Sequence, residues 1–266
     1  MHLLELLESK KASILFGGNR TVLECDTDAR VIGVRTLGLY PDYPLHLRGS
    51  MCLHAGPYEY QPLLNHSRRT GALMFVLTRH GDVVVALGGE VILTKRENTW
   101  RACPAGDLVD AIASALRNVD THLPKPGRDV FGLFLGMLAL TLRNRRRGAL
   151  VAVARPTKMA ILLLRTAEQS PVEKFCQGSL SGKHLAGVSI SVLCNALSVD
   201  GATLIDTRGV IRRFGAILPA RIRSGAGEGA RTRAAEEASR YGLALKISED
   251  GPITVYCNGR MVARVN

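Results

Sequence analysis

The stretch VDGATLIDTRG, from Val199 to Gly209, joins a helical pattern to a short apolar strand through an aspartate and a glycine. Further along the chain, the stretch GEGARTRAAEEAS, from Gly227 to Ser239, passes from a glycine-rich loop into a second helical pattern. Strands that alternate with helices in this way are typical of mixed α/β domains. We therefore expect an α/β fold in this half of the chain.

Hydrophobic periodicity around these stretches predicts the rest of a C-terminal domain. Apolar residues at helical spacing predict a helix over residues 182–199, on a stripe made of Leu185, Val188, Val192, Ala196 and Val199. The apolar run 131–142 predicts a buried helix, because a membrane span needs about 20 residues. We expect strands at 202–206 and 210–217, a helix over 230–241 and a closing meander over 243–265. This pattern predicts a mixed sheet with helices on both faces.

A polar stretch with two prolines, NVDTHLPKPGRD at residues 118–129, predicts a boundary between domains. We expect a smaller α+β domain over residues 1–120 and the mixed-sheet domain over residues 128–266. The smaller domain contains a predicted meander at 72–96 and a predicted helix at 104–119. We interpret it as a sensor or regulatory domain.

The two halves also share a pattern. Residues 77–96 align without gaps on residues 247–266, and SRRTGAL at 67–73 echoes NRRRGAL at 144–150. The echo indicates either an internal duplication or the general likeness of meanders. At the first turn, Thr78-Arg79-His80 stands opposite Ser248-Glu249-Asp250, so only the second copy carries carboxylates.

The composition is strongly basic, with 35 Lys and Arg against 23 Asp and Glu and a net charge of +12, which favours polyanionic partners. Two basic stretches are compatible with nucleic-acid contact or with a solvated face: Arg143, Arg145, Arg146 and Arg147, and then Arg208, Arg212 and Arg213. Only one tryptophan is present, so base stacking is not indicated.

The six cysteines are scattered and form no CxxC pair, which argues against a disulfide framework or a zinc site and favours a cytoplasmic protein. The N-terminal residues 1–11 predict a short amphipathic helix and not a signal peptide. No insertion into a membrane is expected.

The glycine-rich loop before residue 230 predicts a phosphate site. Glycines at 225, 227 and 229 let a backbone approach an anion closely, and the start of a helix offers unpaired N–H groups. Arg231 and Arg233 lie at the same helix end, where their charge is unfavourable for the helix alone but suits phosphate oxygens. An ordinary surface loop is the alternative. A Walker motif is absent from the sequence, so the usual P-loop is excluded.

Two carboxylate positions accompany this loop. Asp200 ends a predicted helix, where the helix dipole disfavours a negative charge, and Glu249 lies in the first turn of the closing meander. Each has a simpler interpretation as a turn residue. Together with a phosphate site they predict a place for Mg²⁺ or Mn²⁺.

The motifs DGA at 200–202, GARTRAA at 229–235 and SED at 248–250 resemble, in order and spacing, the diadenylate cyclase family, over roughly residues 128–266. This resemblance implies that two ATP molecules condense to cyclic di-AMP and two pyrophosphates across a dimer, or a larger homo-oligomer, of facing domains. It implies that Asp200 and Glu249 bind the metal, and that Asp200, Arg231 and Arg233 are catalytic. It also implies that the nucleotide is bound by Gly201, Ala202, Leu218, Gly229, Arg231, Thr232 and Arg233.

The sequence departs from the family pattern at the helix start. The family has threonine and histidine where this chain has Ala230 and Thr232, so a hydroxyl and an imidazole are lost. A catalytically weak nucleotide-binding sensor is therefore a second hypothesis. A basic nucleic-acid-binding protein with an incidental nucleotide site is a third.

Overall fold

The computed structural model describes residues 21–28, 30–36, 54–77, 82–96, 99–162, 171–218, 229–249 and 251–265. The predicted helix at 1–11 and the glycines at 225 and 227 lie outside these residues. In chain order the elements are β1 (Thr21–Cys25), β2 (Val31–Thr36), η2 (Tyr58–Tyr60), α3 (Gln61–Thr70), β3 (Met74–Leu77), β4 (Val83–Leu87), β5 (Glu90–Arg96), β6 (Thr99–Ala102), α4 (Ala105–Val119), α5 (Lys125–Asn144), β7 (Ala149–Ala154), α6 (Pro156–Leu162), α7 (Pro171–Leu180), η3 (Leu185–Gly187), α8 (Ile190–Leu197), β8 (Ala202–Asp206), β9 (Ile211–Ala216), α9 (Ala230–Ala238), β10 (Gly242–Ile247), β11 (Ile253–Cys257) and β12 (Arg260–Val265).

The chain divides into two compact units, and the division differs from the predicted boundary at residues 118–129. The first unit comprises Met1–Pro41 and Glu59–Cys103, and the second comprises Asp42–Tyr58 and Pro104–Asn266. The helix α4 belongs to the second unit because its apolar face contacts α5 and strands β10, β11 and β12. The Cys257 thiol, whose pKa is raised by burial, donates from β11 to the carbonyl oxygen of Ala115 in α4 at 3.9 Å.

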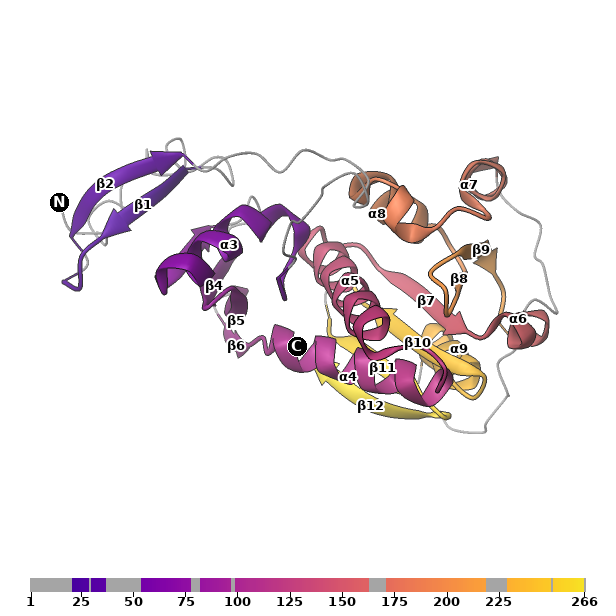
Figure 1. Ribbon diagram of the computed structural model, residues 1–266. Helices are drawn as coiled ribbons and strands as arrows, with labels where there is room; N and C mark the ends of the chain where they lie inside the picture. Colours follow the sequence, from indigo (N-terminus) through magenta and orange to yellow (C-terminus); the bar gives the residue numbers. More distant parts are fainter. Residues whose placement is uncertain are drawn as a thin grey trace. The chain divides into compact units, whose positions relative to one another are not determined.

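The second unit is built on a six-stranded mixed sheet in the order β12-β11-β10-β7-β8-β9 (Figure 1). Only β7 and β8 are parallel, and every other neighbouring pair is antiparallel. The predicted closing meander is present as β10, β11 and β12, and the strands predicted at 202–206 and 210–217 are β8 and β9. The mixed α/β class expected from the sequence is confirmed.

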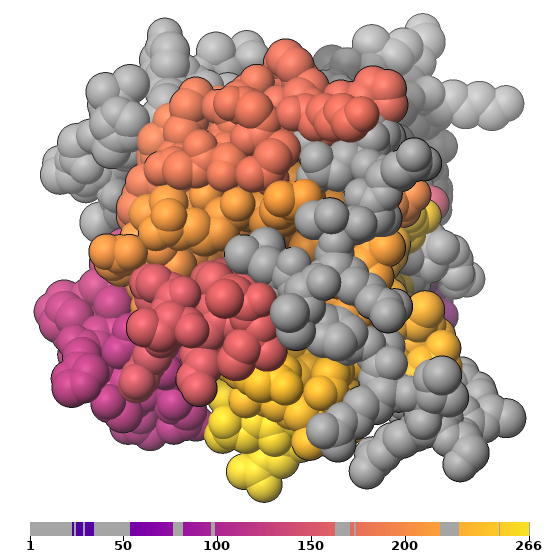
Figure 2. All heavy atoms as spheres, turned by 90° about the vertical axis from the view of Figure 1, so that its right-hand side faces the viewer, coloured from indigo at the N-terminus to yellow at the C-terminus, as the bar shows by residue number. Residues whose placement is uncertain are grey.

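Helices cover both faces of this sheet, as the sequence predicts. The face that carries Leu150, Leu204 and Ala244 packs against α6 and α9 in one apolar cluster. The opposite face contacts α4, α5 and α8. Figure 2 shows the surface of this unit on the side of α6, which lies between the orange surface of α7 to β9 and the yellow C-terminal strands. No helix in the described part of the chain is long and apolar enough to cross a membrane.

The helix predicted over residues 182–199 is only half present. Residues 185–187 form a single 3-10 turn, and α8 begins at Ile190, where the hydroxyl of Ser189 accepts a hydrogen bond from Val192 N–H at 3.4 Å. Val192, placed on the buried stripe by the prediction, is 45% exposed. The prediction is wrong before residue 190 because the Ser189 cap starts the helix there.

The first unit contains a two-stranded sheet, β1-β2, and a four-stranded antiparallel sheet in the order β3-β4-β5-β6. The meander predicted at 72–96 corresponds to β3, β4 and β5. Its second turn is Gly88-Gly89, and both glycines have positive φ, as a tight hairpin turn requires.

The sequence echo extends to the strand pairing. Every residue pair that joins β4 to β5 recurs 170 residues later between β11 and β12, from Val83↔Lys95 and Ile253↔Val265 onward. The register shift between Val85 and Ala86 recurs between Val255 and Tyr256. Pairs of β3 with β4 recur in the same way between β10 and β11. Shared register and a shared bulge favour an internal duplication over a general likeness of meanders.

The two copies of the meander, β3–β5 and β10–β12, differ in how the sheet face that carries Phe75 and Leu245 is covered. Phe75 in β3 is 56% exposed, whereas its counterpart Leu245 in β10 is 1% exposed beneath helices of the second unit. Other large apolar residues exposed in the first meander and its neighbouring strand are Leu73, Leu87, Leu93 and Trp100.

Gly201 has a structural role at the start of β8. Its φ is +88°, and an added Cβ would lie 2.7 Å from the carbonyl carbon of Gly215 in β9. We expect Gly201→Ala to lower the free energy of unfolding by about 1–3 kcal/mol, because alanine is strained at positive φ. Urea denaturation measures the change. Gly178→Ala is the control, since no atom lies within 4 Å of its added Cβ; equal stability of both variants would contradict the assignment.

Candidate functional site at one edge of the six-stranded sheet

Most of the residues singled out by sequence lie at one edge of the sheet of the second unit. β7 and β8 begin at this edge, and β9 and β10 end there, as the pairing of Lys246 with Leu150, Leu150 with Ala202 and Ala202 with Ala216 shows. Asp200 lies two residues before β8, and Glu249 lies two residues after β10. Ala202 and Lys246 are two strand spacings apart, roughly 10 Å. Two carboxylates that are distant in the sequence are therefore brought to the same edge.

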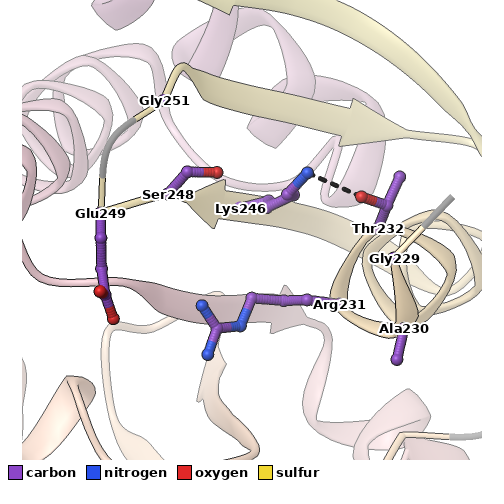
Figure 3. Close-up of a pocket in the computed structure, with 8 residues that line it drawn as sticks. All are labelled: Gly229, Ala230, Arg231, Thr232, Lys246, Ser248, Glu249 and Gly251. Atoms are coloured by element: carbon purple, nitrogen blue, oxygen red, sulfur yellow. Dashed lines mark hydrogen bonds between the residues drawn. The ribbon is translucent and has the colours of Figure 1, made fainter.

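An open pocket of about 570 Å³ lies at this edge, where α9 begins (Figure 3). This volume is within the range of about 300–1,000 Å³ found for small-molecule sites. The pocket is lined by Gly229, Ala230, Arg231, Thr232, Lys246, Ser248, Glu249 and Gly251. Its walls are therefore the first turn of α9, the end of β10 and the turn that follows.

The amino end of α9 gives the pocket an anion-binding character. Gly229 is the N-cap, and as a glycine it makes no side-chain capping hydrogen bond. The first N–H groups of a helix have no partner within it and lie at the positive end of the helix dipole. Arg231, in the same turn, adds a positive charge to the lining of the pocket.

Lys246 is a pocket residue that the sequence analysis missed. Its Nζ donates a hydrogen bond to Thr232 Oγ1 at 2.7 Å, which links β10 to the first turn of α9. Figure 3 shows the lysine side chain directed toward that turn. A lysine inside an otherwise apolar strand, LALKI at residues 243–247, was the available signal.

The side chains of Arg231 and Glu249 both lie close to Gly148. A Cβ added to Gly148 would lie 2.6 Å from Nη1 of Arg231 and 3.4 Å from Oε1 of Glu249. The guanidinium and the carboxylate therefore flank the backbone just before β7, and Figure 3 shows the two side chains directed toward the same region. In the sequence, Gly148 stands out only as part of the NRRRGAL echo.

Gly148→Ala is expected to displace the Arg231 guanidinium and to weaken, roughly three- to tenfold, the ATP binding that the family resemblance implies. The overlap involves the far end of a flexible side chain, so the melting temperature should change little. Calorimetric titration and a thermal melt of the same sample measure both effects. An unchanged Kd would mean that Arg231 does not act from the observed position.

Other predicted site residues lie outside the described lining of the pocket. Asp200 and Gly201 are exposed at the sheet edge, whereas Ala202 and Leu218 are buried in the apolar cluster under α9. Arg233 is half-buried. It points away from Arg231 because residues two apart lie on nearly opposite sides of a helix. Residues 219–228 and Asp250, which adjoin the pocket in sequence, lie outside the described residues.

The carboxylates were tested against the requirements of a divalent ion. Among the described residues no group of three or more His, Cys, Asp or Glu side chains is placed to hold a metal. Mg²⁺ is usually held by only one or two carboxylates together with substrate phosphates. Glu249 lines the pocket and Asp200 lies at the same sheet edge, so the carboxylates available here are of the kind and number that Mg²⁺ takes.

One arginine of the second basic stretch, Arg212, stabilises the fold. Asp206 is fully buried at the end of β8 and accepts hydrogen bonds from Arg212 Nη2 at 2.6 Å and Nε at 2.9 Å. It also accepts from the backbone N–H of Arg208 and of Val210. Arg212 is thus bound within the β8–β9 turn by Asp206. This contact argues against a nucleic-acid surface there.

No protein-family model and no curated protein matches the chain. Solved structures that resemble it include a hypothetical membrane spanning protein from Bacillus cereus, with a TM-score of 0.40 and 18% sequence identity, over 60% of this chain and 89% of that chain. Another is DacA from Staphylococcus aureus, solved as a double mutant, with a TM-score of 0.32 and 17% identity over 60% of this chain and 87% of that chain. Both similarities are distant and concern the fold alone.

Proposed function

We propose that this protein is a diadenylate cyclase, which condenses two ATP molecules into cyclic di-AMP with release of two pyrophosphates. The observation that carries the proposal is the pocket at the amino end of α9. It gathers Arg231, Thr232 and Lys246 beside Glu249, at the same sheet edge as Asp200. Cations, helix N–H groups and carboxylates in this arrangement suit a triphosphate with its metal ion.

In the proposed reaction, the 3′-hydroxyl of each ATP attacks the α-phosphate of the other, so two phosphodiester bonds form and two pyrophosphates leave. Arg231 and the first N–H groups of α9 hold the triphosphate. Asp200 accepts the proton of the attacking hydroxyl. Mg²⁺ or Mn²⁺, held by Asp200 and Glu249, would neutralise charge on the phosphates. Such chemistry depends mainly on positioning and charge stabilisation.

The reaction needs two domains, each holding one ATP, so the proposal includes a homodimer or a larger homo-oligomer of the second unit. A cytoplasmic location belongs to the proposal as well. Arg233, Leu218, Gly201 and Ala202 retain the nucleotide-binding roles that the family resemblance implies.

A second candidate is a nucleotide-binding sensor with little or no turnover. It is favoured by Thr232, which provides no imidazole, and by the position of Asp200 outside the lining of the described pocket. Incubation with ATP and Mn²⁺ or Mg²⁺, followed by chromatography of the products, distinguishes the two. Cyclic di-AMP supports the cyclase. Tight ATP binding without product under either metal supports the sensor.

A further inference from the structure

Lys246 occupies an unusual place for a lysine. All the other residues of β10 are buried, and Lys246 is the one partly buried position in the strand. It pairs with Leu150 of β7 on the sheet face that packs against α9. Desolvating a charged group in such surroundings costs free energy unless polar partners compensate. Stability of the sheet therefore does not explain a lysine here.

The duplicated meander shows which residue the fold accepts at this position. Val76 of β3 pairs with Val84, as Lys246 of β10 pairs with Thr254, in the same register. Val76 is only 8% exposed and faces the side of its sheet that contacts α3. An apolar residue thus satisfies the fold in one copy, and the lysine occurs in the copy that has the pocket.

The ammonium of Lys246 is directed to the anion-binding end of α9. Its hydrogen bond to Thr232 Oγ1, at 2.7 Å, holds it beside the first helical turn, on the pocket that Arg231 also lines. Figure 3 shows the lysine and the arginine reaching the pocket from different elements, a strand and a helix. An ammonium carries three N–H donors and can contact an anion while a hydroxyl positions it.

We infer that Lys246 binds the phosphate chain of the nucleotide, together with Arg231, and that Thr232 positions it. The inference rests on the proposed function of the pocket as a triphosphate site. In this chain Lys246 of β10 supplies a positive charge next to Thr232 of α9, whose side chain is a neutral hydroxyl. Lys246 is accordingly a binding residue, and Thr232 is a positioning residue.

Lys246→Val is the direct test, because valine is the residue of the first copy. We expect the Kd for ATP and for inorganic tripolyphosphate to rise by a similar factor, roughly tenfold, through loss of a charge-assisted contact. Lys246→Arg should retain most of the affinity. Thr232→Val, which keeps the lysine, should raise both Kd values roughly threefold. Lys183→Val, which removes a lysine exposed near the start of β9, is the matched control and should leave both Kd values unchanged.

The outcomes separate this inference from the proposed function. Wild-type protein that binds neither ATP nor tripolyphosphate would overturn both. Wild-type binding that is unchanged in Lys246→Val would overturn the role of Lys246 alone. Lys246→Val could instead lower the melting temperature while Lys246→Arg binds ATP as weakly as Lys246→Val does. In that case the lysine would have a structural role, and the inference would be overturned.

Discussion

Replacing Asp200 with asparagine is expected to reduce cyclic di-AMP formation roughly 100-fold or more while the fold is retained. Asparagine keeps the size of the side chain and removes its charge, so it can neither accept the hydroxyl proton nor hold the metal as a carboxylate does. Charge stabilisation by a bound metal contributes several kcal/mol, and each 1.36 kcal/mol changes the rate about tenfold. Asp200 is exposed, so its substitution should not disturb packing.

Initial rates with saturating ATP and Mn²⁺, together with a thermal melt, measure this effect. Asp129→Asn removes an exposed carboxylate from α5 and is the matched control for net charge. Its rate should equal that of the wild type. If Asp200→Asn turned over ATP as fast as this control, Asp200 would have no part in the mechanism.

The second large effect is expected at Arg231. Arg231→Ala should weaken ATP binding roughly 10- to 100-fold, because a hydrogen bond to a charged group contributes about 1.5–3 kcal/mol. The side chain lines the pocket and lies against Gly148, so its loss removes the guanidinium from the phosphate site itself. Calorimetric titration with ATP in the presence of Mg²⁺ measures the change.

Two other arginines of this region serve as comparisons. Arg240→Ala removes the same charge near the opposite end of α9, where Arg240 pairs with Glu237 at 3.0 Å, and should leave ATP affinity unchanged. Arg233→Ala should weaken binding less than Arg231→Ala, since Arg233 does not line the described pocket. If Arg233→Ala lost much of the ATP affinity and Arg231→Ala lost none, the phosphate site would lie on another side of α9.

Much of the second unit was predictable because its strands and its longest helix carry strong local signals. The closing meander has β-branched strands separated by turn residues, and its turn at Asn258-Gly259 adopts positive φ at both positions. The apolar run of α5 is long enough to identify a buried helix. The pairing of β7 with β8 depends on contacts between distant segments, and no local pattern encodes it.

The prediction of one helix over residues 182–199 failed because a local signal competed with a stronger one. Apolar spacing continued through residues 182–189, but the Ser189 cap starts α8 later. The polar stretch at 118–129 suggested a boundary, whereas the apolar face of α4 attaches it to the sheet that follows. The apolar pattern of α4 predicts that one face of the helix is buried, but it does not indicate which unit that face will contact.

The site was predictable in part for a similar reason. Gly229, Arg231, Thr232 and Glu249 were found from motifs, and the structure gathers all four around one pocket. Lys246 and Gly148 lie in other segments and join the site only through the sheet, so sequence reasoning did not find them.

The most direct test of the proposed function is the mass of the product formed from a mixture of ordinary and adenine-labelled ATP. Purified protein is incubated with both forms and Mn²⁺, and the nucleotides are separated and weighed by mass spectrometry. A cyclase that joins two ATP molecules must yield, besides unlabelled and doubly labelled cyclic di-AMP, a product in which one adenine is labelled and the other is not. Bound ATP that is recovered unchanged with either metal and at every protein concentration would contradict the cyclase.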